Sequence, residues 1–296
     1  MDTKISRKIE NNLPNSLTDK IIRRKITLKE EDIQGIIFKI AETTNELEQA
    51  FCLLHDVYVR EGYTNRHHSR MRLSKYNFHP ETTVFIGKKG DKVIITCTLF
   101  PDSTFLGLPM DSLYQAELDL LRNQNKKIAE IGALATHPDY RTSNSTLPLL
   151  LNKITMAYAI HNLKMDNMVI NVNPKHSFFY TSILLFKQIG SLKSCTHVNG
   201  EPALAYSLDL NSVESNSKII YSKQSKTRNL HQFFFKKKSS CITRPKEKTY
   251  VWDQKMLTYF FEDKTDILSS MSKDTLNQVH RQHLHFMRKD IIKMAA

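Results

Sequence analysis

Apolar positions form two short runs of strand length in the middle of the chain, and each run is followed by a helical pattern. The runs cover residues 128–135 and 168–172. Each leads through a Pro-containing turn, His137-Pro138 or Asn173-Pro174, into helical spacing. Two such units predict neighbouring strands with both helices beginning at one edge, where unpaired N–H groups favour anions. We expect a ligand site at that edge.

The segments on either side of this centre predict the rest of a mixed sheet. In chain order, the expected elements are a strand at 36–40, a helix at 43–60, a hairpin at 83–100, a helix at 111–121 and a last strand at 202–210. Thr43, with Glu46 three residues later, forms a capping-box pattern. The predicted fold class is therefore α+β, with helices flanking a mixed sheet.

Charge divides the chain into regions. The formal net charge is +13, but residues 31–210 carry equal numbers of acidic and basic side chains, so the tails hold the excess. The predicted organisation is a basic irregular N-terminal arm at 1–32, a folded domain at 33–210, a basic linker at 211–248 and a helical C-terminal extension at 249–296.

Cysteine and apolar patterns predict a soluble, cytoplasmic protein. The four cysteines are widely separated and lack the paired spacing of a zinc site, so we expect reduced thiols. The N-terminus has no apolar stretch of signal-peptide length, and no segment reaches the roughly 18 to 20 apolar residues of a membrane span. The adjacent His67-His68 pair is a weak metal pattern, because sequence neighbours point apart on regular elements. No metal is expected.

A basic stretch follows the first predicted helix, from Arg66 to Lys75. Two interpretations remain open for it. It is either a solvated face or a loop that covers an acidic ligand or partner.

Glu130 is a carboxylate inside an otherwise apolar strand. Strand alternation predicts Glu130, Gly132, Leu134 and Thr136 on one face, with Ala133 and Ala135 on the other. An unpaired charge there would be costly, so Glu130 either pairs with an Arg or a backbone N–H, or acts as a base or amine-binding group. Burial would raise its pKa toward the range where proton transfer works near neutral pH.

Several motifs together resemble the GNAT superfamily of acyltransferases, and more closely the FeeM-like N-acyl amino acid synthases, relatives of the acyl-homoserine lactone synthases. The motifs are LHDVYVREGY at 54–63, EIGALATHPDYR at 130–141, NPKHSFFY at 173–180 and NGEPALAYSLDL at 199–210. The resemblance covers about residues 36–210 and neither tail. It implies a GNAT-like, mostly antiparallel sheet whose central parallel strands splay to hold the pantetheine arm of an acyl donor.

The resemblance also implies site residues. The backbone of Ala133, Leu134 and Ala135 would pair with the pantetheine arm, and Arg141 would begin a phosphate-facing loop that includes Ser143, Asn144 and Ser145. Tyr180 stands where many GNAT enzymes keep an acid near the leaving thiol, and His176 belongs to the same helical opening. Glu130 would lie at the acceptor end.

One departure from the superfamily bears on the acyl donor. The loop after Arg141 contains no Gly in residues 142–146, although close backbone approach to a pyrophosphate favours Gly. A single phosphodiester, as on acyl carrier protein, needs less. Acyl carrier protein is therefore the expected donor and partner, with acyl-CoA as the alternative, and no permanently bound cofactor is expected.

The sequence thus predicts an N-acyltransferase that moves a medium- or long-chain fatty acyl group to the amine of an amino acid or similar small acceptor. Two alternatives stay open. One is a catalytically idle GNAT-fold binding module. The other is a nucleic-acid or membrane-surface binder using the basic tails, although only residues 233–238 interleave aromatics with Lys, which disfavours nucleic acid.

Overall fold

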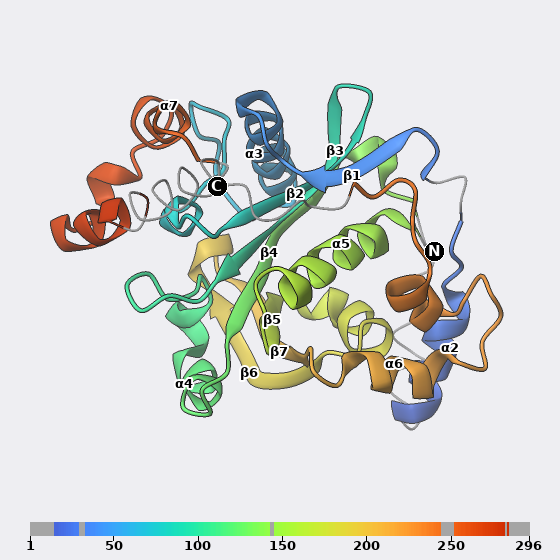
Figure 1. Cartoon of the computed structure of the whole chain (residues 1–296). Coiled ribbons are helices and arrows are strands. Elements are labelled where there is room, and N and C mark those ends of the chain that lie inside the picture. Colours follow the sequence, from blue (N-terminus) through green and yellow to red (C-terminus); the bar gives the residue numbers. More distant parts are fainter. Residues whose placement is uncertain (1–14, 30–32, 143–144, 244–251, 282, 284–296) are drawn as a thin grey trace, which may run out of the picture.

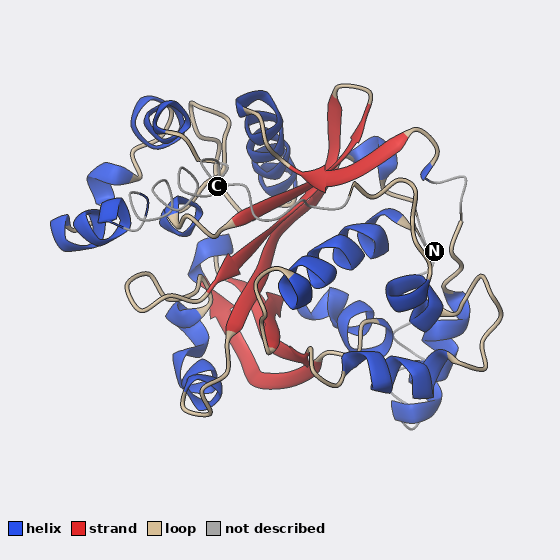
Figure 2. Cartoon of the chain, viewed as in Figure 1, coloured by secondary structure: helices blue, strands red, loops and turns tan. Residues whose placement is uncertain are grey.

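A computed structural model describes residues 15–29, 33–142, 145–243, 252–281 and 283 of the chain. Seven strands form one sheet in the order β1-β2-β3-β4-β5-β7-β6 (Figures 1 and 2). The strands are β1 (Ile36–Ile40), β2 (Thr83–Lys89), β3 (Lys92–Pro101), β4 (Ile128–Thr136), β5 (Asn167–Val172), β6 (Lys187–Cys195) and β7 (Glu201–Asp209). The helices are α2 (Asn15–Lys25), α3 (Thr44–Arg60), α4 (Asp111–Arg122), α5 (Leu147–His161), α6 (Val213–Tyr221) and α7 (Gln254–Thr258).

The elements expected before the centre of the chain are confirmed. Helix α3 begins after Thr43, whose side chain accepts a hydrogen bond from the Glu46 N–H at 3.2 Å. The hairpin of β2 and β3 turns at Gly90, where φ is +58°. Asp111 opens α4, and its carboxylate accepts from the Leu108 N–H at 2.6 Å.

Helices cover both faces of the sheet. Neighbouring residues of β2 lie in different clusters: Phe85 packs with α5, whereas Val84 and Ile86 pack with α3. Because successive strand residues point to opposite faces, α5 and α3 lie on opposite sides. The fold class expected from the sequence, α+β with helices flanking a mixed, mostly antiparallel sheet, is confirmed.

Strands β4 and β5 run parallel but pair over three residues only, from Ile128 with Asn167 to Glu130 with Val169. All other strand pairs in the sheet are antiparallel. Beyond Glu130, the edge of β4 that faces β5 has no strand partner in the described residues. The expected splay of the two central strands is therefore present, and Glu130 is the last paired residue before it.

The expected alternation along β4 is wrong after Gly132. Ala133 has φ +53°, and the pairing with β3 shifts register here, with Thr98 opposite Gly132 but Thr96 opposite Ala135. This bulge inserts one residue and reverses the faces. Leu134 consequently packs on the α5 side, whereas Ala133 and Ala135 pack on the α3 side.

The segment after β5 also differs from the expected helix. It forms a 3-10 turn at Pro174–His176 and a π-helical turn at Phe179–Ile183, and Leu185 has φ +67°. Strand β6 then follows, which the apolar pattern did not predict. It lies at the sheet edge, and most of its side chains are not buried.

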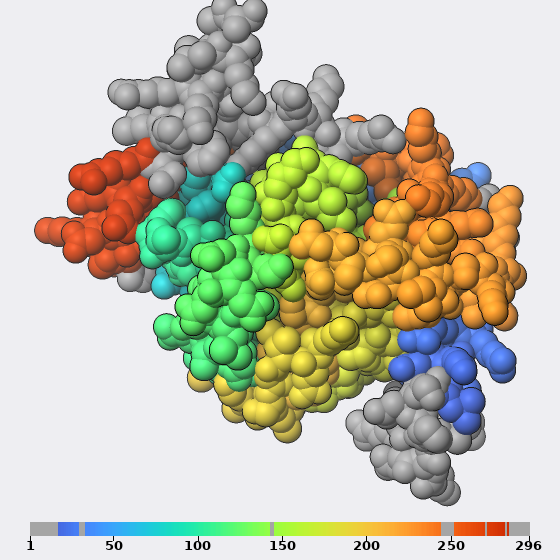
Figure 3. Space-filling model, turned by 60° about the horizontal axis from the view of Figure 1, so that its bottom comes forward, coloured from blue at the N-terminus to red at the C-terminus, as the bar shows by residue number. Residues whose placement is uncertain are grey.

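Parts of both tails pack on the domain: the expected irregular N-terminal arm contains helix α2, and its Ile22 packs against the α5-side cluster. Val213, Tyr221, Leu230 and Phe233 join the α5-side cluster, so this part of the expected linker is not solvated; Figure 3 shows the orange segment against the light-green one. Trp252 stacks on Phe51 of α3. The domain boundaries themselves remain predictions. No helix within the described part of the chain has the length and apolar character needed to cross a membrane.

Candidate active site

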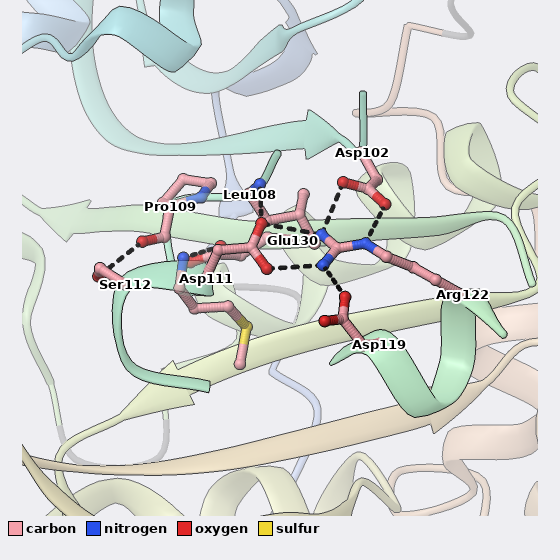
Figure 4. A network of polar contacts seen from close by, with 9 residues as sticks. Asp102, Leu108, Pro109, Asp111, Ser112, Asp119, Arg122 and Glu130 are labelled. Carbon is pink, nitrogen blue, oxygen red and sulfur yellow. Dashed lines mark hydrogen bonds and ion pairs between the residues drawn. The ribbon is translucent and has the colours of Figure 1, made fainter. Parts of the chain in front are cut away.

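Glu130 is buried at the point where β4 and β5 separate, with 3% of the residue exposed. Its Oε2 accepts a hydrogen bond from the Met110 N–H at 2.8 Å (Figure 4). No Lys or Arg forms an ion pair with it among the described residues. Of the sequence alternatives, the backbone partner is therefore present and the Arg partner is not seen in the described chain.

Burial raises the pKa of Glu130 to about 8. The Met110 N–H opposes this rise, and the nearby Asp111 carboxylate adds to it. A carboxyl group with this pKa is mostly protonated at pH 7, yet it ionises close to the pH at which amines begin to lose their proton. The group can therefore exchange a proton with a bound amine near neutral pH.

An ion-pair network holds the segment that supplies the Met110 N–H. Arg122 of α4 contacts the carboxylates of Asp102, Asp111 and Asp119 at 2.7–2.8 Å (Figure 4). Asp102 follows β3 and Asp111 opens α4, so the network ties together the two ends of the loop between them. These contacts fix the backbone opposite Glu130.

The backbone of Ala133, Leu134 and Ala135 lies on the open stretch of β4. Ala135 pairs with Thr96 of β3, whereas Ala133 and Leu134 lie in the bulge, and the β5 side carries no strand partner in the described residues. Unpaired backbone N–H and C=O groups at such an edge can bind an extended ligand by strand-like hydrogen bonds. Their pairing with the pantetheine arm of a donor stays a prediction.

Arg141 lies beyond the end of β4, on the other side of the splay from Glu130. Its Nε donates to the Thr136 carbonyl at 3.0 Å, and its Nη1 contacts the Glu61 carboxylate at 2.6 Å. Lys175, after β5, approaches Glu61 at 3.9 Å. Two cations from the two splayed strands thus share one carboxylate at this end.

The remainder of the expected phosphate-facing loop is only partly described. Ser143 and Asn144 lie outside the described residues. The Ser145 hydroxyl accepts from the Leu147 N–H at 3.3 Å, at the start of α5. The Thr146 hydroxyl accepts from the Lys29 N–H at 3.0 Å, so the N-terminal arm reaches this helix end.

His176 groups with Arg141 and Lys175 rather than with Glu130. Its pKa is lowered mainly by partial burial and also by the positive charges of Lys175 and Arg141. The Glu61 carboxylate opposes this effect. The imidazole is therefore neutral at pH 7. His176 therefore lies at the outer end of the splay with Lys175, Glu61 and Arg141, and its catalytic role stays a prediction.

Tyr180 lies on the α5 face, opposite Glu130. Its ring packs edge to face against Phe179 at 5.2 Å and Phe186 at 5.8 Å, and 5% of the residue is exposed. Burial raises the pKa of Tyr180 far above its usual value. A hydroxyl of this kind can donate a hydrogen bond to a thiolate, but complete proton transfer to a thiolate of pKa ~8.5 is uphill.

Three residues that the sequence did not single out, Tyr58, Tyr63 and Arg72, join the site. Tyr58 of α3 lies under the Arg72 guanidinium, whose carbon is 4.9 Å from the ring centroid. Tyr58 also meets Tyr63 edge to face at 5.5 Å. Both tyrosines belong to the 54–63 motif, which could have marked them; Arg72 had no signal beyond its place in a basic stretch.

The first half of the basic stretch lies on the outer side of α3. Residues 66–70 contact the helix directly, with the His67 N–H donating to His55 Nε2 at 3.1 Å. A cavity of about 680 Å³ lies beside this contact, and its lining residues are His55, Asp56, Val59, Arg60, Arg66, His67 and Arg70. Asp56 pairs with Arg70 at 2.7 Å, which leaves Arg60 and Arg66 as net positive charge. In the described part of the chain, no three His, Cys, Asp or Glu side chains gather as a metal site would require.

Comparisons with known proteins agree with this geometry. The family model of the N-acyl amino acid synthase FeeM matches residues 49–209. The structure of FeeM, an N-acyl amino acid synthase from uncultured soil microbes, is 28% identical with a TM-score of 0.54, over 61% of this chain and 94% of that one. No curated protein sequence matches the chain.

A second solved structure supports the fold alone. BjaI, a CoA-dependent acyl-homoserine lactone synthase, has a TM-score of 0.51 and 15% identity, over 73% of this chain and 97% of that one. The resemblance inferred from the sequence motifs is confirmed by these matches.

Proposed function

Because the chain belongs to the family of the N-acyl amino acid synthase FeeM and is an acyltransferase, we propose that it acylates amino acids or similar small amines. The acyl group would be a medium- or long-chain fatty acyl carried as a thioester. One observation carries the proposal: the buried Glu130 carboxyl group lies at the last paired position before the central strands separate. A base at that point can meet an amine while the thioester occupies the splay.

The reaction is a direct aminolysis. The neutral amine attacks the thioester carbonyl, and Glu130 accepts the proton that the nitrogen loses. Backbone N–H groups at the open edge of β4 stabilise the oxyanion. The C–S bond then breaks, and the thiolate takes a proton from protonated Glu130, so the products are an amide and a free thiol.

We propose acyl carrier protein as the acyl donor. Arg141 and Lys175 can hold one phosphodiester at the outer end of the splay, and the cavity lined by Arg60 and Arg66 adds positive charge next to Glu61. An acidic carrier protein is attracted to such a surface. Acyl-CoA is the alternative, and contact of the basic tails with a membrane surface remains a further prediction.

We place the reaction in the cytoplasm. All four cysteines of the chain are free thiols. Free thiols are the usual state in a reducing compartment. This supports the location, and fractionation of cells that express the protein tests it.

The direct test combines the purified enzyme, dodecanoyl-thioesters and each common amino acid. Thiol release and mass spectrometry of the amide report turnover. Thioester cleavage no faster than without enzyme, for every acceptor, would refute the proposed activity.

The donor is tested by comparing dodecanoyl-carrier protein with dodecanoyl-CoA at equal concentration. Faster turnover with the CoA ester would reverse the assignment. Arg66→Glu should raise KM for the carrier protein more than KM for the CoA ester, because only the carrier protein brings acidic side chains to that surface.

A further inference from the structure

Arg72 is a partly buried guanidinium without an acidic partner in the described chain. Its Nη2 donates to the His197 carbonyl at 2.7 Å, and its guanidinium carbon lies 4.9 Å from the Tyr58 ring centroid. No carboxylate of the described residues pairs with it. A charge withdrawn from water is costly when it has no counter-ion. The remaining N–H groups of Arg72 are therefore suited to an anion that no described residue supplies.

A short series of hydrogen bonds connects Arg72 to the surroundings of Glu130. Ser112, two residues after Met110, shares a hydrogen bond of 3.0 Å with the His197 ring. The carbonyl of the same His197 holds Arg72, while the N–H of Met110 holds Glu130. The start of α4 and the segment after β6 thus bring the Arg72 guanidinium and the Glu130 carboxyl group to the same side of the domain.

Electrostatics support this placement. Burial raises the pKa of Tyr58; the Arg72 guanidinium opposes that rise and the Glu130 carboxylate adds to it. Burial is also the main cause that raises the pKa of Cys195. The Glu130 carboxylate adds to this rise and the Arg72 guanidinium opposes it. Tyr58 and Cys195 are therefore within electrostatic reach of both Arg72 and Glu130.

We propose that Arg72 binds the carboxylate of the acceptor, so that the enzyme selects α-amino acids over amines that lack a carboxylate. The inference rests on the proposed function, since it names the acceptor class of the same site. An α-amino acid carries its amine and its carboxylate on one carbon, so it can present the amine to Glu130 and the carboxylate to Arg72. A guanidinium binds a carboxylate through two parallel hydrogen bonds, which lysine cannot reproduce.

The test compares acceptors that differ only in the carboxylate. The probes are L-phenylalanine, its amide and phenethylamine, with L-leucine, its amide and isoamylamine as a second set. Arg72→Gln removes the charge, Arg72→Lys keeps the charge without the planar pair of donors, and Arg228→Gln is a control for loss of one exposed arginine.

We expect Arg72→Gln to lower kcat/KM for the amino acids by roughly 30-fold, which corresponds to about 2 kcal/mol. The amides and decarboxylated amines should change by less than about threefold, and Arg72→Lys should fall between the wild type and Arg72→Gln. Loss of the same factor for every acceptor, or an unchanged preference for amino acids, would overturn the inference. Circular dichroism and melting curves confirm that the compared variants are folded.

A binding measurement separates this inference from the proposed activity. Melting temperatures are recorded with 10 mM of each probe and without any acyl donor. The amino acids should stabilise the wild type and the Arg228→Gln control but not Arg72→Gln, whereas phenethylamine and isoamylamine should not distinguish the three. If Arg72-dependent stabilisation is seen without acyl transfer, the inference stands and the proposed activity fails. Stabilisation by the amino acids that is equal in all three proteins, or absent from all three, contradicts the inference.

Discussion

Replacing Glu130 by Gln tests the proposed mechanism most directly. The amide keeps the size of the side chain and can still accept from the Met110 N–H, at 2.8 Å in the native chain, but it cannot take a proton. We expect kcat to fall by roughly 10²-fold or more, the usual scale for loss of a general base. The matched control is Glu214→Gln, which removes an exposed carboxylate that pairs with Lys236 on the C-terminal segment.

The pH dependence of the rate carries the same information. Because the pKa of Glu130 is about 8, the fraction of Glu130 that is ionised and can act as a base increases as the pH rises from 6 to 8. The wild-type kcat/KM should therefore increase across this range in part through Glu130. In Glu130→Gln the contribution of this group disappears, and only the ionisation of the acceptor amine remains. An identical profile in both proteins would exclude Glu130 as the titrating base.

Stability gives an independent measure of the same shift. The pKa of Glu130 is raised from 4.5 to about 8 in the folded protein, so between these values the folded state holds a proton that the unfolded state has lost. The free energy of unfolding therefore falls as pH rises through this window. The scale is roughly 3 kcal/mol between pH 4.5 and pH 7, from about 1.4 kcal/mol per pH unit.

Urea denaturation of the wild type and Glu130→Gln at pH 5, 6, 7 and 8 measures this difference. The variant should gain stability relative to the wild type as the pH rises. The contradicting result would be a variant whose free energy of unfolding is lower than that of the wild type by the same amount at every pH, and whose kcat per folded molecule is unchanged. That result would make Glu130 a structural residue and remove it from the mechanism.

Three further substitutions test the neighbouring parts. Because proton transfer from Tyr180 to a thiolate is uphill, Tyr180→Phe should lower kcat by less than about tenfold, and a larger loss in steady-state assays would make Tyr180 an essential acid. Glu61→Gln should lower KM for the acyl donor several-fold, because it releases Arg141 from its ion pair. The free energy of unfolding in urea should change by at most about 1 kcal/mol, because the pair is exposed. A raised KM would contradict this prediction. Trp252→Ala should lower the free energy of unfolding in urea by about 3–5 kcal/mol, because the buried ring packs on Phe51. The control Leu120→Ala should lower it little, because this residue is 65% exposed. Equal losses in the two variants would refute the packing argument.

Local patterns were sufficient to predict most of the sheet and the position of Glu130. Strands β1 to β5 and β7 carry apolar runs or alternation, and Thr43 caps α3 as the sequence predicts. Strand β6 escaped prediction because it lies at the sheet edge, where only Gly190 and Cys195 are buried and no apolar alternation is needed. The packing of residues 213–233 was hidden by a polar, basic composition in which the buried side chains are widely spaced.

The bulge at Ala133 could not be predicted from periodicity. A two-residue repeat gives no sign of an inserted residue, and the usual marker of positive φ, Gly, is absent at this position. The unpaired state of Arg72 was equally invisible, because a basic residue in a basic stretch is more often solvated. Both facts depend on contacts between segments far apart in the chain.

Three departures from local rules concern the surroundings of the proposed site. Glu130 is a carboxyl group in an apolar strand, Ala133 has a backbone conformation that disfavours a Cβ, and Arg72 is a partly buried cation without a described counter-ion. Each is unfavourable for folding alone, and each lies next to the separation of β4 and β5 or is connected to it by hydrogen bonds. The proposed site would use all three, Glu130 as the base, the open backbone of β4 for the donor and Arg72 as the carboxylate-binding cation, and unfavourable features of this kind are a known mark of functional sites.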